Sequence, residues 1–166
     1  MSWGNYKKRA QESGGGGGKF VRMKGDGDTC NVVVLGTPME RWSRWTGSTY
    51  ETCEPDDDGC RTSYIMNVWD LDNSAMRLLE LNSPTFVDLA DAMDEEDDPE
   101  NTHIRIKRNG TGTSTRYSIR PRGLVSAGLQ KVLTGEKEEL DDLTEFGGHT
   151  IKEPPAPLAP DEDVPF

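Results

Sequence analysis

Residues 31–35 read NVVVL, a run that is almost entirely apolar and β-branched, and it lies within the longer stretch 29–36, TCNVVVLG. A run of this kind is typical of a strand that is buried on both faces. Other short apolar runs, separated by turn residues, follow along most of the chain. We therefore predict strands at residues 19–24, 29–36, 40–46, 63–71, 75–81, 102–108 and 114–120.

One segment between these strands has helical rather than alternating periodicity. Ser83 is the expected N-cap and Pro84 the first helical residue. An apolar stripe follows at Phe86, Leu89, Ala90 and Met93, and the acidic run 94–98 with Pro99 ends the helix. Weaker helical periodicity occupies residues 124–133 and 136–146. About five to seven short strands with one inserted helix predict a mainly β fold, and a small OB-like barrel fits this pattern better than a sandwich.

The clustering of glycine and proline divides the chain into three parts. Five consecutive glycines at 14–18 are typical of a flexible linker, so residues 1–18 are expected to be an N-terminal arm with its linker. Residues 19–146 are the expected folded domain, with a length that suits one domain of about 100–150 residues. Residues 147–166 are expected to be a flexible proline-rich linker followed by a disordered acidic tail.

Composition also bears on the compartment. No stretch has the roughly 20 apolar residues of a membrane span, and the first residues lack the apolar region of a secretory signal. The sequence therefore predicts a cytoplasmic protein with no membrane partner. Its cysteines, Cys30, Cys53 and Cys60, are an odd number, which favours reduced thiols in a chain without an export signal.

Residue types that carry enzymatic chemistry are sparse. The chain has two histidines, His103 and His149, and neither belongs to a recognisable pattern of nucleophile, base and acid. Six residues separate Cys53 from Cys60, whereas the cysteines of structural zinc sites are usually about two to four residues apart. We predict no enzyme, no catalytic residue, no cofactor and no metal site.

Tryptophan and arginine alternate in residues 40–46, ERWSRWT. Because successive side chains of a strand point to opposite faces, Arg41 and Trp45 share one face and Trp42 and Arg44 the other. Single-stranded nucleic acid exposes its base faces, and stacking on an aromatic ring contributes about 1–3 kcal/mol per base while nearby cations contact phosphates. The alternation leaves open which face would contact a ligand.

The net charge of −11 disfavours nucleic acid as a ligand, but the charge is unevenly distributed. Residues 101–123 contain six basic residues and no acidic one, whereas residues 84–100 contain eight acidic residues and no basic one. Strand alternation predicts that the basic side chains gather on one face, as a phosphate-binding groove requires. The candidate residues for single-stranded DNA are Arg22, Lys24, Arg41, Trp42, Arg44, Trp45, Arg105, Lys107, Arg108, Arg116 and Arg120.

The sequence ends in an acidic cluster followed by an apolar tip. Its six residues are Asp161, Glu162, Asp163, Val164, Pro165 and Phe166. A partner pocket with an apolar lining and a basic rim could bury the Phe166 ring and pair with its carboxylate. We therefore predict that this tip binds partner proteins.

This ending, DEDVPF, closely resembles the acidic Pro-Phe tip of bacterial single-stranded DNA-binding proteins. The whole chain is similar, more loosely, to small phage single-stranded DNA-binding proteins with an OB fold. The similarity lies in the order of the arm SWGNYKKR, the glycine run, the segment KFVRMKGDGDTCNVVVLG, RWSRW, the acidic helix and the hairpin IRIKRNGTGTSTRYSIRP. The chain lacks the recognisable zinc-binding Cys/His cluster of the T4-type members.

The resemblance implies a function and a set of partners. It implies cooperative coating of single-stranded DNA in phage replication, recombination and repair, within the host cell cytoplasm, and recruitment of replication proteins by residues 161–166. The N-terminal arm is a candidate for self-association or for packing on its own barrel. The alternative is an acidic DNA mimic that inhibits a host nucleic-acid enzyme, which the net charge favours and the basic hairpin does not.

Overall fold

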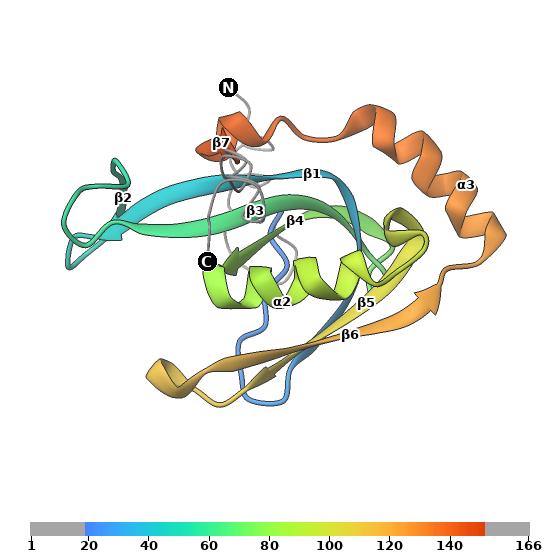
Figure 1. The fold of residues 1–166 in the computed structure, drawn as a ribbon, viewed down its shortest axis with the longest axis horizontal. Helices are drawn as coiled ribbons and strands as arrows, with labels where there is room; N and C mark the ends of the chain where they lie inside the picture. The colour runs from blue at the N-terminus through green and yellow to red at the C-terminus, as the bar shows by residue number, and fades with distance from the viewer. Residues whose placement is uncertain (1–18, 152–166) are drawn as a thin grey trace, which may run out of the picture.

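The computed structural model describes residues 19–151, and the strands in this part of the chain form one antiparallel sheet (Figure 1). Its five main strands lie in the order β4–β3–β1–β5–β6. Their bounds are Thr29–Trp45 (β1), Arg61–Asp70 (β3), Ala75–Asn82 (β4), Thr102–Asn109 (β5) and Arg116–Leu124 (β6). Two short strands, Tyr50–Thr52 (β2) and Gly148–Thr150 (β7), also pair with β1. The mainly β class is confirmed, and the sheet is open rather than a closed ring.

Strand β1 joins two segments that the sequence predicts as separate strands, 29–36 and 40–46. The register with β3 shifts between Leu35 and Met39, where Gly36 has a positive φ of 75°. A Cβ atom at Gly36 would lie 2.6 Å from Cδ1 of Leu140, so the bend also brings two parts of the chain close together. Glycine and proline at 36–38 indicate a turn by residue type, but here they bend a strand that continues.

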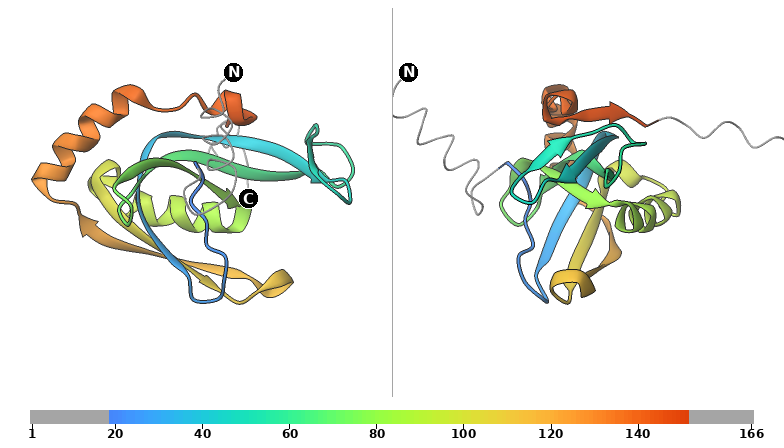
Figure 2. Two further views of the ribbon diagram at one scale, coloured as in Figure 1. Left: turned by 180° about the vertical axis from the view of Figure 1, so that it is seen from behind. Right: turned by 90° about the vertical axis from the view of Figure 1, so that its left-hand side faces the viewer.

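The run 31–35 is buried on both faces, as predicted. Val32 and Val34 pack with residues of β3, β4 and β5 and with the helix α2 (Ser83–Asp94). Val33 and Leu35 pack on the opposite side, where Leu133 of the helix α3 (Ala127–Glu136) contacts them. Figures 1 and 2 show α2 and α3 on opposite sides of β1. One strand therefore contributes to two apolar clusters.

The inserted helix is confirmed, but its cap is one residue earlier than predicted. Asn82 caps α2, and its Oδ1 accepts the backbone N–H of Thr85 at 3.0 Å. The Ser83 hydroxyl donates instead to the Thr62 carbonyl at 3.1 Å. No helix within residues 19–151 is long and apolar enough to cross a membrane.

The segments predicted as helical near the C-terminus are only partly so. The first, 124–133, begins as a strand, and α3 starts after Ser126, whose hydroxyl accepts the backbone N–H of Leu129. In the second, 136–146, the chain forms two short 3-10 turns, Lys137–Glu139 and Leu143–Phe146. Residues 148–150, which we expected to belong to a flexible linker, instead form β7 on β1.

Two further expectations are wrong. Residues 19–24 do not form a strand, and their sheet contact is a single bridge between Phe20 and Leu78. Cys53 and Cys60 form a disulfide, although the cysteine count favoured reduced thiols. The intervening residues fold into two turns that bring the two Cα atoms to 6.0 Å, a distance that spacing in the sequence does not reveal. Cys30 is free, and burial raises the pKa of its thiol to about 12.

Candidate nucleic-acid interface

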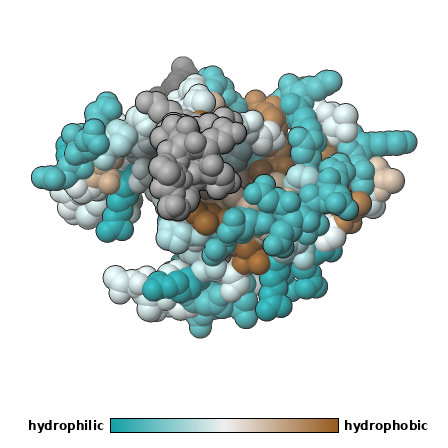
Figure 3. Space-filling model, viewed as in Figure 1, coloured by the Kyte–Doolittle hydropathy of each residue, from teal (hydrophilic) through white to brown (hydrophobic). Residues whose placement is uncertain are grey.

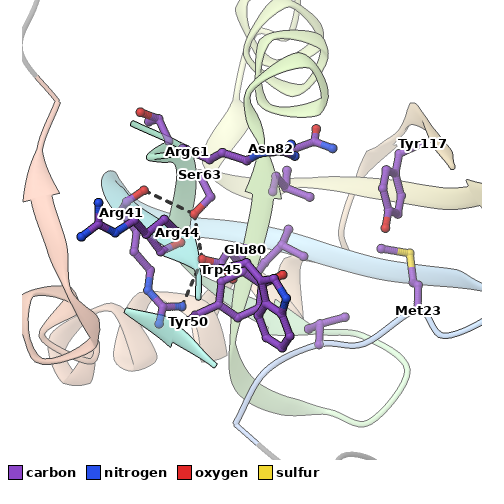
Figure 4. A pocket seen from close by; sticks show the side chains of 16 residues that line it. Met23, Arg41, Arg44, Trp45, Tyr50, Arg61, Ser63, Glu80, Asn82 and Tyr117 are labelled. Carbon is purple, nitrogen blue, oxygen red and sulfur yellow. Dashed lines mark hydrogen bonds and ion pairs between the residues drawn. The ribbon is translucent and has the colours of Figure 1, made fainter. Parts of the chain in front are cut away.

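A cleft of about 980 Å³ lies between the arm formed by β1, β2 and β3 and the β5–β6 hairpin. Figure 3 shows the hollow that separates these two parts of the surface. The close view in Figure 4 has Tyr117 and Met23 on one side of the cleft and Arg44, Trp45 and Arg61 on the other. The cleft therefore has two walls from distant parts of the sequence, and β3 and β4 contribute the residues between them.

Two aromatic rings are exposed at the cleft. Trp45, at the end of β1, and Tyr50, at the start of β2, are directly opposite each other in the sheet register. Their ring centroids are 4.9 Å apart at an angle of 60°, and the residues are 57% and 69% exposed. Aromatic rings usually bury most of their surface, so such an exposed pair is typical of a binding surface.

Three arginines line the cleft beside these rings. Arg41 pairs with Glu80 at 3.1 Å, and Glu80 also accepts a hydrogen bond from the Ser63 hydroxyl at 2.8 Å. Arg44 pairs with Glu51 at 2.6 Å, and this hydrogen bond raises the pKa of Arg44 above its usual value. The third is Arg61, at the start of β3. Each guanidinium carries five N–H donors, so the paired arginines keep donors for a ligand.

A second hollow, of about 480 Å³, adjoins the cleft and shares four lining residues with it. It adds Arg22, Lys24 and Arg108 to the lining. Arg108 donates from Nη1 to the Met23 carbonyl at 2.8 Å, which holds residues 22–24 beside the β5–β6 hairpin. The charged residues that line the cleft and the second hollow are six cations and one carboxylate, Glu80. Cations therefore outnumber carboxylates in this lining although the net charge of the chain is −11, and Glu51 neutralises Arg44 from outside the lining.

Trp42 lies away from the cleft. Its ring stacks on His149 of β7 with centroids 3.8 Å apart and an angle of 8°, and its Nε1–H donates to Glu40 at 3.1 Å. Arg41 and Trp45 therefore mark the cleft face of β1, which strand alternation alone left undecided. Arg44 also lines the cleft, although alternation places it on the face of Trp42.

The predicted basic residues of the β5–β6 hairpin divide between two faces. Arg108 and Tyr117 are register partners on the inner side, where Arg108 lines the second hollow and Tyr117 the cleft. The outer side presents Arg105, Lys107, Arg116 and Arg120, which line neither hollow and are exposed. Alternation thus correctly groups Arg105, Lys107, Arg116 and Arg120 on one face, but Arg108 lies on the other and the hairpin separates the grouped cations from the cleft.

Among the aromatic and basic residues that line the cleft, sequence reasoning missed three: Tyr50, Arg61 and Tyr117. Tyr117 had a usable signal, because alternation placed it on the face opposite Arg116. Tyr50 and Arg61 flank the acidic loop 51–60 and had none, because the pairing of β1 with β2 and with β3 places them near Trp45.

Other polar clusters in residues 19–151 do not form a site of this kind. No group of three or more His, Cys, Asp or Glu side chains in this part of the chain could hold a metal ion. His103 Nε2 lies 2.7 Å from Oδ1 of Asn31, and burial, followed by the charge of Arg122, lowers the pKa of His103. The predicted partner-binding residues 161–166 lie outside the described residues.

No protein-family model matches the sequence, and neither a curated protein nor a solved structure matches the chain.

Proposed function

We propose that this chain binds single-stranded DNA in the cleft, with little sequence specificity. The observation that carries the proposal is the exposed pair of Trp45 and Tyr50 facing Tyr117 across a cleft rich in cations. Aromatic faces stack on any base, and arginines and lysines beside them contact phosphates. The combination suits a single strand better than a duplex, whose base faces are already stacked.

The order of the strands supports an OB-like classification. An OB fold is a five-stranded, partly open Greek-key barrel whose ligand lies on its second and third strands, between the loop that joins strands 1 and 2 and the loop that joins strands 4 and 5. The five main strands of this chain have an open order, and the second and third of them, β3 and β4, contribute to the cleft. Residues 46–60 and 110–115 are the corresponding loops.

The wider role rests on the resemblance of the sequence rather than on geometry. In this proposal the chain coats and protects single-stranded DNA in phage replication, recombination and repair. Its C-terminal tip, residues 161–166, recruits partner proteins, and its N-terminal arm contacts neighbouring copies. The protein acts in the host cytoplasm as a binding protein and not as an enzyme, without a cofactor.

The test is a titration of intrinsic tryptophan fluorescence with an oligothymidylate of about eight nucleotides, within the usual site size of an OB fold. The unchanged protein should show quenching that weakens as salt is added. Trp45→Ala should bind about 5–150-fold more weakly, because loss of one stacked base costs about 1–3 kcal/mol. Because this change also removes a fluorophore, the affinities are compared by anisotropy of a labelled oligonucleotide.

Trp42→Phe is the matched control, because it changes a tryptophan of the same strand on the face away from the cleft. It should bind as the unchanged protein does. Equal losses in the two variants, or no binding of the unchanged protein at low salt, would contradict the proposal. Binding to basic proteins in place of oligonucleotides would support the DNA mimic instead.

A further inference from the structure

The outer face of the β5–β6 hairpin carries five exposed cations. We use the term outer face for Arg105, Lys107, Arg116, Arg120 and Arg122. Among the ion pairs within residues 19–151, none involves these five side chains, although the chain has 30 acidic residues. The only side-chain hydrogen bond found for them in this region runs from Arg116 to the Thr115 carbonyl. Their charges are therefore available to a ligand.

The arrangement of these cations opposes folding. Arg105 and Arg120 are direct cross-strand partners, and Lys107 lies two residues further along β5 on the same face. Like charges that face each other across a pair of strands destabilise the pairing. After burial, the charges of Arg122 and Arg105 also lower the pKa of His103, whereas the charge of Asp72 raises it. An anionic ligand would remove this repulsion.

The outer face is separate from the cleft. The residues that alternate with these cations point inward. They are Ile104 and Ile106 of β5 and Ile119 of β6, and they pack in the apolar cluster that also contains Leu89 of α2. Tyr117, which lines the cleft, belongs to the same inward set. The hairpin is thus a wall with the cleft on one side and the cations on the other, and its tip is formed by residues 110–115 (Figure 1).

The shape of the outer face favours an extended polyanion. Alternate residues of a strand are about 7 Å apart and neighbouring strands about 4.8 Å apart, so the cations form two parallel rows. The outer cations line neither the cleft nor the second hollow. A phosphodiester backbone has regularly spaced charges that can follow such rows.

We infer that the outer face binds the backbone of the same DNA strand that occupies the cleft, after that strand passes around the tip of the β5–β6 hairpin. This inference rests on the proposed function, because both surfaces share one ligand. It predicts two modes of binding. An oligonucleotide of about six nucleotides fills the cleft alone, whereas one of about 20 nucleotides also contacts the outer face.

The test compares the full chain with the double variant Arg105→Ala/Arg120→Ala, which removes two charges and their mutual repulsion. Affinity for the six-nucleotide probe should not change. The 20-nucleotide probe is kept in excess, so that one protein binds each strand. Its slope of log K against log salt should become shallower by about 1.4 in the double variant, because each of the two lost phosphate contacts contributes about 0.7. Between 50 and 200 mM salt, the affinity should then fall about sevenfold less than it does for the unchanged protein.

The control is Lys131→Ala/Lys137→Ala, which removes two positive charges near α3, outside both hollows. It should leave both probes unaffected. An unchanged salt slope with the long probe in the Arg105/Arg120 variant would overturn the inference, and so would equal losses with both probes. A free peptide of residues 152–166 serves as a second ligand. If the Arg105→Ala/Arg120→Ala variant binds this peptide more weakly than the unchanged protein does, but binds the 20-nucleotide probe equally well, the outer face binds an acidic tail and the inference is wrong. Loss of short-probe binding in Trp45→Ala tests the proposed function separately.

Discussion

Glu80 is the one carboxylate among the charged residues that line the cleft and the second hollow. It holds Arg41 at 3.1 Å and accepts a hydrogen bond from Ser63 at 2.8 Å. Glu80→Gln keeps the shape of the side chain and removes its charge. The variant should bind single-stranded DNA more tightly, because it removes repulsion of the phosphates and leaves Arg41 free to contact one of them.

The size of the gain follows from the exposure of this pair. Both side chains are about one-third exposed, and the dielectric constant of bulk water gives the lower limit of the interaction energy. Two unit charges at about 4 Å then interact by about 1 kcal/mol, which corresponds to roughly fivefold in affinity. One additional phosphate contact also steepens the slope of log K against log salt by about 0.7. The cost in the free energy of unfolding should be about 0.2–1 kcal/mol, as for other exposed ion pairs.

The assay is anisotropy of a labelled oligothymidylate of about eight nucleotides, measured between 50 and 200 mM salt, with urea unfolding as the stability measurement. Glu100→Gln is the matched control, because Glu100 pairs with Lys137 at 3.0 Å outside the cleft. The control should leave affinity unchanged. Weaker binding by Glu80→Gln, or the same gain in both variants, would refute the argument that Glu80 restrains Arg41 within the binding surface.

Two further predictions concern the frame of the cleft. Reduction of the disulfide between Cys53 and Cys60 by a dithiol reagent should lower the free energy of unfolding by about 2–3 kcal/mol, the value that the chain-entropy account gives for a loop of this length. It should also weaken binding of DNA, because Tyr50 and Arg61, which line the cleft, flank this loop. Urea unfolding and anisotropy with and without the reagent measure both effects, and equal values would contradict the role of the loop. Asn82→Ala should cost about 1 kcal/mol of stability through loss of the α2 cap, whereas a larger loss in Ser83→Ala would show that the cap is assigned to the wrong residue.

Local patterns in the sequence predict those parts of this fold that depend on neighbouring residues. The run 31–35 indicates a doubly buried strand because its side chains leave neither face polar, and the structure confirms it. The break predicted at Gly36 fails because a bend that continues and a turn that reverses use the same residue types. Only the pairing of β1 with β3 on both sides of the bend distinguishes the two, and that pairing joins residues 18–38 positions apart.

The candidate site shows the same limit. Alternation separates Trp42 from Trp45 but treats the two faces of β1 as equivalent. The difference arises from β7, which places His149 on Trp42 and leaves Trp45 facing the cleft. Likewise, alternation separates Tyr117 from the cations of β6 but does not say which of the two faces adjoins the cleft. The cleft lies on the side of Tyr117, because the apolar cluster that contains Leu89 of α2 and the strands β1 and β3 are on that side. Both outcomes depend on tertiary contacts that no local pattern contains.

The burial of β1 on both faces has a thermodynamic consequence for ligand binding. Val32 and Val34 belong to one apolar cluster and Val33 and Leu35 to the other, so the backbone between them cannot leave one cluster without disturbing the other. The two halves should therefore melt in a single cooperative transition. The same strand ends at Trp45, so a ligand in the cleft stabilises the entire domain by mass action, by about 2.7 kcal/mol at a free concentration 100 times its Kd. Protection of amide hydrogens in α3, far along the chain from the cleft, becomes a measure of occupancy at Trp45.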